Sequence, residues 1–142
     1  MANRSQIIAA ARRWLGTPYH HEARLFGAGV DCAQLLYAVY VEDCGVVPPF
    51  DIEHYPSDWM MHRGEERFLS YLQAHADRVD VPLPGDIVMY QWGRCYAHGA
   101  IVLEWPQIIH ADIRAGRVVI SDGNIGHFEG RPVEYFRVRG VE

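Results

Sequence analysis

The sequence predicts an α+β domain in which N-terminal helices pack against a C-terminal antiparallel sheet. Apolar residues recur at helical spacing up to Ala76, and short β-rich runs separated by turn residues follow. Helices followed by strands are typical of this fold class. The chain has 142 residues, of which 49% are hydrophobic and 12% aromatic, so it is long and apolar enough to bury one core. We therefore expect a single domain over residues 1–142.

The first predicted helix covers residues 5–16, SQIIAAARRWLG, with Ser5 as candidate N-cap and Gly16 as candidate end. One face of this helix carries the apolar side chains of Ile7, Ile8, Ala11, Trp14 and Leu15. The next stretch, residues 17–30, is rich in Gly, Pro and aromatic residues. It is predicted to be an irregular loop.

Two more helices are predicted before the strands. The second begins at Asp31 or Cys32, because apolar residues then share one side at helical spacing, and it ends at Cys44–Gly45. Residues 46–59 contain three prolines and are predicted to be a loop. The third helix covers residues 64–76, GEERFLSYLQAHA.

The second half of the chain predicts the strands of the sheet. Each run is short, rich in β-branched and aromatic residues, and bounded by turn residues. The runs are residues 85–92, 98–105, 107–113, 117–123 and 133–140. They predict an antiparallel sheet against which the helices pack.

Charge and composition argue against two classes of protein. The net charge of -5 disfavours a nucleic-acid binder, and no basic stripe offsets it. No apolar run approaches the ~20 residues that cross a bilayer, so no membrane span is predicted. The N-terminus lacks the apolar stretch and the cleavage site of a signal peptide. This predicts a protein made in the cytoplasm without an export signal of its own.

The chain has three cysteines, Cys32, Cys44 and Cys95, and none lies in a CxxC motif. A disulfide framework needs more cysteines in even number, so free thiols are expected. The spacing of cysteines and histidines is also poor for a structural zinc site. We predict that Cys44 and Cys95 are inert and that the protein needs no metal or organic cofactor.

Cys32 lies where a helix begins, which is a favourable place for a reactive thiol. Asp31 is a good N-cap residue, so Cys32 is predicted to occupy the first helical turn. Unpaired N–H groups and the helix dipole there favour an anion, and a thiol pKa of ~8.5 falls to ~3.5–7.5 in such places. We therefore expect a lowered pKa. The alternative is a small buried residue that merely begins an amphipathic helix, and position alone does not separate the two.

His98 and His110 lie in adjacent predicted strands joined by a turn. A hairpin centred on Glu104 places the two histidines directly opposite each other, with Cβ atoms ~4.5–5.5 Å apart. A turn one residue longer breaks this pairing. One imidazole would take the thiol proton and later protonate a leaving amine, while the other holds the first ring in a useful tautomer. The alternative for each is a strand histidine that bonds only to backbone.

Three pieces of the chain resemble the NlpC/P60 family of cysteine peptidases, especially the short single-domain versions of phage tail modules. The pieces are residues 16–40 (GTPYHHEARLFGAGVDCAQLLYAVY), 83–90 (LPGDIVMY) and 98–112 (HGAIVLEWPQIIHAD). The resemblance implies a papain-like α+β fold for a single catalytic domain. It also implies that Cys32 is the nucleophile, His98 the general base and acid, and His110 the orienting residue.

The same resemblance assigns roles around the nucleophile. Tyr19 matches a family tyrosine whose hydroxyl stabilises the oxyanion, together with the backbone N–H of Cys32, and Asp31 matches an acidic residue that anchors the loop. Gln34 departs from the family, which often has Gly at that position, so we expect it to alter the substrate groove. Independently of the family, we hypothesise that Trp59 walls one side of the substrate cleft. The alternative is an aromatic residue that only covers the core.

The reaction that the resemblance implies is hydrolysis of amide bonds in bacterial peptidoglycan stem peptides, typically between γ-D-glutamate and a diamino acid. The expected site of action is the cell wall, as part of a phage-like particle, with other phage tail proteins as partners. Three alternatives remain open. They are an N-acetylmuramoyl-L-alanine amidase, an acyltransferase with the same Cys-His machinery, and a non-catalytic tail-assembly binding protein.

Overall fold

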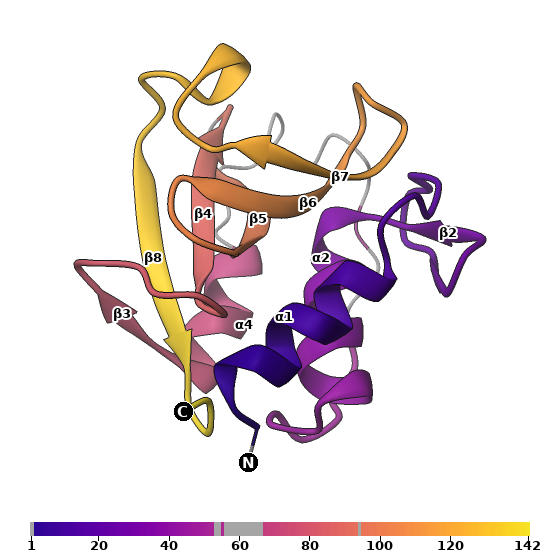
Figure 1. Cartoon of the computed structure of the whole chain (residues 1–142), viewed down its shortest axis with the longest axis vertical. Helices are drawn as coiled ribbons and strands as arrows, with labels where there is room; N and C mark the ends of the chain where they lie inside the picture. Colours follow the sequence, from indigo (N-terminus) through magenta and orange to yellow (C-terminus); the bar gives the residue numbers. More distant parts are fainter. Residues whose placement is uncertain (1, 53–54, 56–66, 94) are drawn as a thin grey trace.

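The computed structural model describes residues 2–52, 55, 67–93 and 95–142. Its helices α1, α2, η1 and α4 lie on one side of a six-stranded antiparallel sheet (Figure 1), which confirms the predicted α+β fold class. The helical elements are α1 (Arg4–Arg13), α2 (Cys32–Tyr37), the π-helical η1 (Ala38–Asp43), α4 (Arg67–His75) and the 3-10 turn η2 (Gly126–Phe128). In this described part of the chain, no helix is long and apolar enough to cross a membrane.

The sheet runs in the order β3-β8-β4-β5-β6-β7, and all of its neighbouring strands are antiparallel. Its strands are β3 (Ala76–Val79), β4 (Ile87–Trp92), β5 (Cys95–Val102), β6 (Gln107–Asp112), β7 (Arg117–Asp122) and β8 (Val133–Val138). β4 to β8 correspond to the five predicted runs. β3 was not predicted, because the helical pattern extends to Ala76 and the rest of the strand is mostly charged.

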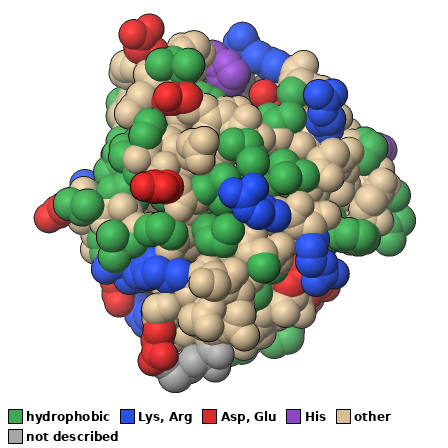
Figure 2. All heavy atoms as spheres, in the orientation of Figure 1, with side chains coloured by type: hydrophobic (Ala, Val, Ile, Leu, Met, Phe, Trp, Pro, Cys, Tyr) green, Lys and Arg blue, Asp and Glu red, His purple; other side chains and the backbone are tan. Residues whose placement is uncertain are grey.

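The loop predicted at residues 17–30 contains a small hairpin. It is made of the two-residue strands β1 (Arg24–Leu25) and β2 (Gly29–Val30), which are too short to leave a sequence pattern. The hairpin leads directly to the start of α2 (Figure 1). On the face shown in Figure 2, acidic and basic side chains are interspersed with apolar ones.

α1 begins earlier than predicted. Asn3 is the N-cap, and its side chain accepts a hydrogen bond from the backbone N–H of Gln6, whose own side chain bonds back to Asn3. This reciprocal pair satisfies two N–H groups that a helix start leaves open. Ser5, the predicted cap, lies inside the helix.

The second helix begins at Cys32, as predicted, with Asp31 as its N-cap. Oδ1 of Asp31 accepts from the backbone N–H of Gln34 at 2.8 Å. The helix continues from α2 into η1 and ends at Cys44, again as predicted. The start of the third predicted helix, residues 64–66, lies outside the described residues.

The turn between β5 and β6 differs from the prediction. Ile101 pairs with Ile109 and Val102 with Ile108, so the hairpin is centred on Trp105 rather than on Glu104. The predicted direct pairing of His98 with His110 is therefore wrong. The two residues are diagonal neighbours on one face of the sheet, a separation that ring side chains still bridge.

The two faces of the sheet have different environments. The inner face packs against α1, α2 and α4 in the main core, and Ala97 and Ile101 of β5 belong to it. The outer face carries a smaller core made of Val88, Tyr90, Ala100, Val102, Ile108 and Phe128. Because side chains alternate along a strand, His98 lies with Ala100 on the outer face. The nucleophile candidate and the histidines thus approach β5 from opposite faces.

Candidate functional site

The sulfur of Cys32 lies against the backbone of β5. It donates to the carbonyl oxygen of Ala97 at 3.6 Å, and the backbone N–H of Gly99 donates to it. These two groups flank His98 on either side. The thiol is therefore at the one stretch of β5 whose central residue is the predicted general base.

A glycine at position 99 is what lets the second helix come so close to β5. A Cβ atom there would lie 2.9 Å from Cδ1 of Leu36 and 3.0 Å from Sδ of Met89. Real Cβ atoms essentially never approach as closely as the first distance and rarely as closely as the second, so a side chain at position 99 would make the ends of Leu36 and Met89 shift. The absence of a side chain at Gly99 thus leaves room for Leu36 of α2 against β5.

The pKa of the Cys32 thiol is raised, not lowered. Burial, and after it the carboxylate of Asp31, raise the pKa to about 12, although the backbone N–H groups of Gly99, Ala33 and Cys32 itself act to lower it. The predicted lowering is therefore wrong for the folded protein. A helix start favours an anion only where the anion keeps polar surroundings, and here the capping carboxylate already occupies the positive end.

The two histidines form one hydrogen-bonded chain that continues to a third residue. Nε2 of His98 lies 2.9 Å from Nδ1 of His110, and Nε2 of His110 lies 2.8 Å from Oγ of Ser121. No described residue hydrogen-bonds to Nδ1 of His98.

Both imidazoles are neutral at ordinary pH. Burial lowers the pKa of His98 well below its usual value, and the neighbouring His110 and His127 lower it further. Burial likewise lowers the pKa of His110 to about 4. A neutral ring has an available lone pair, so it acts as a base toward a neutral thiol.

Aromatic side chains enclose the histidine pair on the outer face. The Phe128 ring lies 5.8 Å from that of His98 and 5.2 Å from that of His110, and the Trp92 ring lies 5.1 Å from His98. η2 therefore places an apolar cover over the hydrogen bond between the two imidazoles. Excluding water there strengthens that bond and accounts for the lowered pKa values.

Tyr19 lies near the sulfur, where the sequence places it. It lines the same cavity as Cys32, and the negative charge of a Cys32 thiolate or of Asp31 adds to burial in raising the Tyr19 pKa. Its backbone N–H bonds to the carbonyl of Gly116 at 2.8 Å, which fixes the loop to the end of the β6–β7 hairpin. The phenol therefore remains protonated and able to donate a hydrogen bond.

Asp31 joins the start of α2 to the surrounding loops. Besides capping the helix, its Oδ2 accepts from the backbone N–H of Glu22 at 2.8 Å and from the hydroxyl of Tyr55 at 2.5 Å. Asp31 is almost fully buried, so these bonds offset the cost of its burial. It has the anchoring place that the resemblance implies.

Gln34 points away from the sulfur toward a polar recess. Its Oε1 accepts from Arg24 at 2.5 Å, and its Nε2 lies 3.5 Å from the Tyr55 hydroxyl. The recess is lined by Glu22, Arg24, Gln34, Tyr37, Phe50, Asp51 and Ile52. Trp59, the other predicted wall of the cleft, lies outside the described residues.

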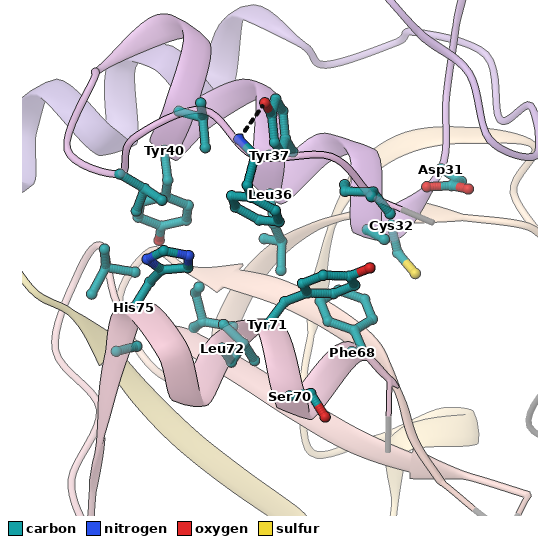
Figure 3. A pocket seen from close by; sticks show the side chains of 18 of the residues that line it. Asp31, Cys32, Leu36, Tyr37, Tyr40, Phe68, Ser70, Tyr71, Leu72 and His75 are labelled. Atoms are coloured by element: carbon teal, nitrogen blue, oxygen red, sulfur yellow. Dashed lines mark hydrogen bonds between the residues drawn. The ribbon is translucent and has the colours of Figure 1, made fainter. Parts of the chain in front are cut away.

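A mostly apolar cavity of about 350 Å³ runs between the second helix and α4 (Figure 3). The sulfur of Cys32 lies at one end of it and His75 at the other, with Leu36 facing Phe68 across it. Apolar lining that adjoins a nucleophile is typical of a ligand cavity. This cavity is the candidate binding site for the acyl side of a substrate.

Sequence reasoning missed two residues of the site, Ser121 and Phe128. Ser121 pairs with Ile108 and lies diagonally beside His110 on the same face. The alternation of β7 places Ser121 on one face, but the order of strands in the sheet is needed to place it beside His110. Phe128 lies in a turn, where the sequence carries no periodic signal.

The other cysteine that the structure reports free, Cys44, does not take part in the site. It is half-buried at the end of η1 and donates to the carbonyl of Gln6. Among the described residues, no group of three or more His, Cys, Asp or Glu side chains is arranged to hold a metal ion.

The sequence matches no model of a known protein family and no curated protein. The structure, by contrast, is similar to several solved structures. The NlpC/P60 domain of the peptidoglycan hydrolase SagA gives a TM-score of 0.61 at 21% identity, over 94% of this chain and 97% of that one. NlpC1 from Trichomonas vaginalis gives 0.67 at 18% identity, over 95% of this chain and 43% of that one.

The peptidoglycan hydrolase RipB from Mycobacterium tuberculosis gives a TM-score of 0.64 at 19% identity, over 94% of this chain and 63% of that one. This chain thus spans nearly all of the SagA domain and less than two thirds of NlpC1 and RipB. Similarity at such low identity establishes the fold, whereas the chemistry has to be argued from the site itself. The chain has the papain-like α+β fold of NlpC/P60 domains.

Proposed function

We propose that this protein is a cysteine-type peptidase that hydrolyses amide bonds in peptidoglycan stem peptides. The observation that carries the proposal is the position of the Cys32 sulfur, between the backbone groups that flank His98, while His98 is bonded to His110. This arrangement supports a nucleophile, a base and an orienting residue at one stretch of β5. Two solved structures with this fold are named peptidoglycan hydrolases, which supports the choice of substrate.

The first half of the reaction forms a thioester. Nδ1 of His98 takes the proton of the Cys32 thiol as the sulfur attacks the carbonyl carbon of the amide. The carbonyl oxygen becomes an oxyanion, which the backbone N–H of Cys32 and the hydroxyl of Tyr19 stabilise. The tetrahedral intermediate collapses, the C–N bond breaks, and His98 returns its proton to the leaving amine.

The second half releases the acid. Water donates a proton to Nδ1 of His98 and attacks the thioester carbonyl, the C–S bond breaks, and the proton passes back to the sulfur. The raised pKa of Cys32 and the lowered pKa of His98 both favour a resting pair of neutral groups. The thiolate thus forms during attack instead of being stored as an ion pair.

The finer assignments are also proposals. We infer from the sequence resemblance that the bond cut joins γ-D-glutamate to a diamino acid. The same resemblance supports a role in a phage-like particle that acts at the cell wall with other tail proteins as partners. Gln34 directs its amide to Arg24, so these two residues shape the rim that a stem peptide would contact.

Acyl transfer is a second candidate function, and the cavity beside Cys32 favours it. A stem peptide is polar, whereas this cavity is lined mainly by apolar residues such as Leu36, Phe68 and Leu72. An apolar acyl group in the cavity would form the same thioester, and an amine would then replace water. Incubation with acyl thioesters of increasing chain length, with and without an amine acceptor, separates the two functions by their products.

The deciding experiment is mass spectrometry of defined muropeptides incubated with the wild-type protein and with Cys32→Ala. We expect the wild type to cleave one amide bond and Cys32→Ala to cleave none while keeping its circular dichroism spectrum and melting temperature. Full cleavage by the folded Cys32→Ala protein would remove the mechanism. Intact muropeptides in both samples, together with acyl transfer in the second assay, would favour the second function.

A further inference from the structure

His110 is bonded at both ring nitrogens, although the proposed mechanism uses only one of them. It is completely buried in the sheet, and its Nε2 lies 2.8 Å from the hydroxyl oxygen of Ser121 on β7. A neutral imidazole has one N–H donor and one acceptor nitrogen. The bond at one nitrogen of His110 therefore determines whether the other nitrogen donates a hydrogen bond to His98 or accepts one from it.

The charged intermediate fixes the direction of these bonds. When His98 holds the thiol proton, both of its nitrogens carry hydrogen, so its Nε2 must donate to Nδ1 of His110. His110 then carries its own proton on Nε2. The hydroxyl of Ser121 is the acceptor within reach of that N–H, and a buried N–H without an acceptor is costly.

We propose that Ser121 is a positioning residue whose hydroxyl holds His110 in the tautomer that leaves Nδ1 of His98 free to accept the thiol proton. The proposal rests on the proposed function, because it assigns the base of that reaction. The Ser121 oxygen lies where it accepts the Nε2–H of His110. A methyl group in place of the hydroxyl has no lone pair to accept that N–H.

Removing the hydroxyl should reverse the two tautomers. In Ser121→Ala the Nε2–H of His110 has lost its acceptor, and a buried lone pair is tolerated more readily than a buried N–H. The proton then prefers Nδ1 of His110, from which it donates to His98. His98 in turn carries its proton on Nδ1, the nitrogen that the proposed mechanism uses, and is unable to act as the base.

The kinetic test compares three variants on a cleaved muropeptide. We expect Ser121→Ala to lower kcat roughly tenfold, the loss of one buried hydrogen-bond partner, with KM unchanged. Ser121→Thr keeps a hydroxyl and should retain most of the wild-type kcat. Ile120→Ala, which truncates the neighbouring side chain on the other face of β7, serves as the control for strand packing. Equal kcat in Ser121→Ala and the wild type would overturn the proposal.

A second measurement needs no turnover, so it separates this inference from the proposed function. Nitrogen-15 NMR of the histidine rings is recorded for the Cys32→Ala protein with and without Ser121→Ala. We expect protonated Nε2 on both His98 and His110 in the first protein and protonated Nδ1 in the second. Unchanged tautomers would refute the role of Ser121. A protein that cleaves no muropeptide but shows the tautomer reversal would refute only the peptidase.

Discussion

At the scale of single residues, the chemistry of the site depends on burial more than on sequence position. Cys32 has the helix-start position that usually lowers a thiol pKa, yet burial and Asp31 raise it. His98 is buried under aromatic rings, which lowers its pKa. Two neutral groups therefore stand where a thiolate was expected.

The raised pKa of Cys32 predicts a distinctive alkylation profile. Because that pKa is about 12, the thiolate fraction rises about tenfold for each pH unit between pH 7 and 10. The rate of iodoacetamide addition to Cys32, followed by mass spectrometry of its peptide, should rise throughout this range. The unfolded protein is the control and should level off near ~8.5, the ordinary thiol pKa. A plateau below pH 7 in the folded protein would indicate a stored thiolate.

The lowered pKa of His110 predicts a loss of stability in mild acid. The pKa falls from an ordinary 6.5 to about 4, so the unfolded chain binds this proton before the folded protein does. Stability is therefore full above pH ~6.5 and falls as the pH decreases toward 4, by about 3 kcal/mol in all at ~1.4 kcal/mol per unit. Urea unfolding at pH 7 and pH 4.5 measures the difference. The difference in unfolding free energy between the two pH values should be smaller in His110→Gln. An equal difference in that variant would show that His110 is not the group whose protonation destabilises the protein.

At the scale of elements, the start of α2 has two separable functions, capping the helix and setting the charge near the sulfur. Asp31 performs both through its buried carboxylate. An asparagine keeps the side-chain oxygen that caps the helix but removes the charge, whereas an alanine removes both. The pair of substitutions therefore separates stability from thiol chemistry.

We expect Asp31→Ala to destabilise the protein by ~1–3 kcal/mol, because the cap and the bonds to Glu22 and Tyr55 are lost. Asp31→Asn should lower the free energy of unfolding by a smaller amount. It should also lower the Cys32 pKa, since the carboxylate raises it. Urea unfolding measures the first effect and the alkylation profile the second. A Cys32 profile unchanged in Asp31→Asn would show that the charge does not reach the sulfur.

The elements that sequence predicted well are those with local signals. Asp31 before an apolar helical repeat marks the start of α2, and turn residues around β-branched runs mark β4 to β8. The turn centre at Trp105 instead of Glu104 left no such signal, because register is set by packing across the sheet. The diagonal contact of His98 with His110 survives that shift because imidazole rings are long enough to span it.

At the scale of the whole molecule, the site depends on contacts between distant parts of the chain. The sulfur comes from α2, the histidines from β5 and β6, and Ser121 from β7. Cys32 and the two histidines became candidates through the predicted helix start, the predicted hairpin and the family resemblance. It did not predict the Ser121 hydroxyl, the Phe128 cover or the burial of the thiol, because each follows from the order and packing of the elements.

One buried carboxylate ties the N-terminal helix to the sheet. Asp86 is fully buried and bonds to Arg4 of α1 at 2.9 Å and to Arg137 of β8 at 2.8 Å. It also accepts from the backbone N–H of Leu83 at 2.8 Å, so three parts of the chain meet at one side chain. Its position holds α1 against the strands that form the main core.

We predict that Asp86→Ala destabilises the protein by ~3–5 kcal/mol, since breaking a buried ion pair leaves its partners uncompensated. Arg4 and Arg137 are each partly exposed, so Arg4→Ala should cost less, because the carboxylate keeps Arg137. Urea unfolding of both variants gives the comparison. An Asp86→Ala cost no larger than that of Arg4→Ala would show that the carboxylate does not organise this junction.

Backbone hydrogen bonds join the two terminal segments of the chain. Ala2 and Val141 make a parallel bridge, and the backbone N–H of Arg4 bonds to the carbonyl of Glu142 at 2.9 Å. The N and C labels accordingly lie close together in Figure 1. A short peptide can therefore join the two ends without stretching the backbone, so a circularised version of this chain is sterically feasible.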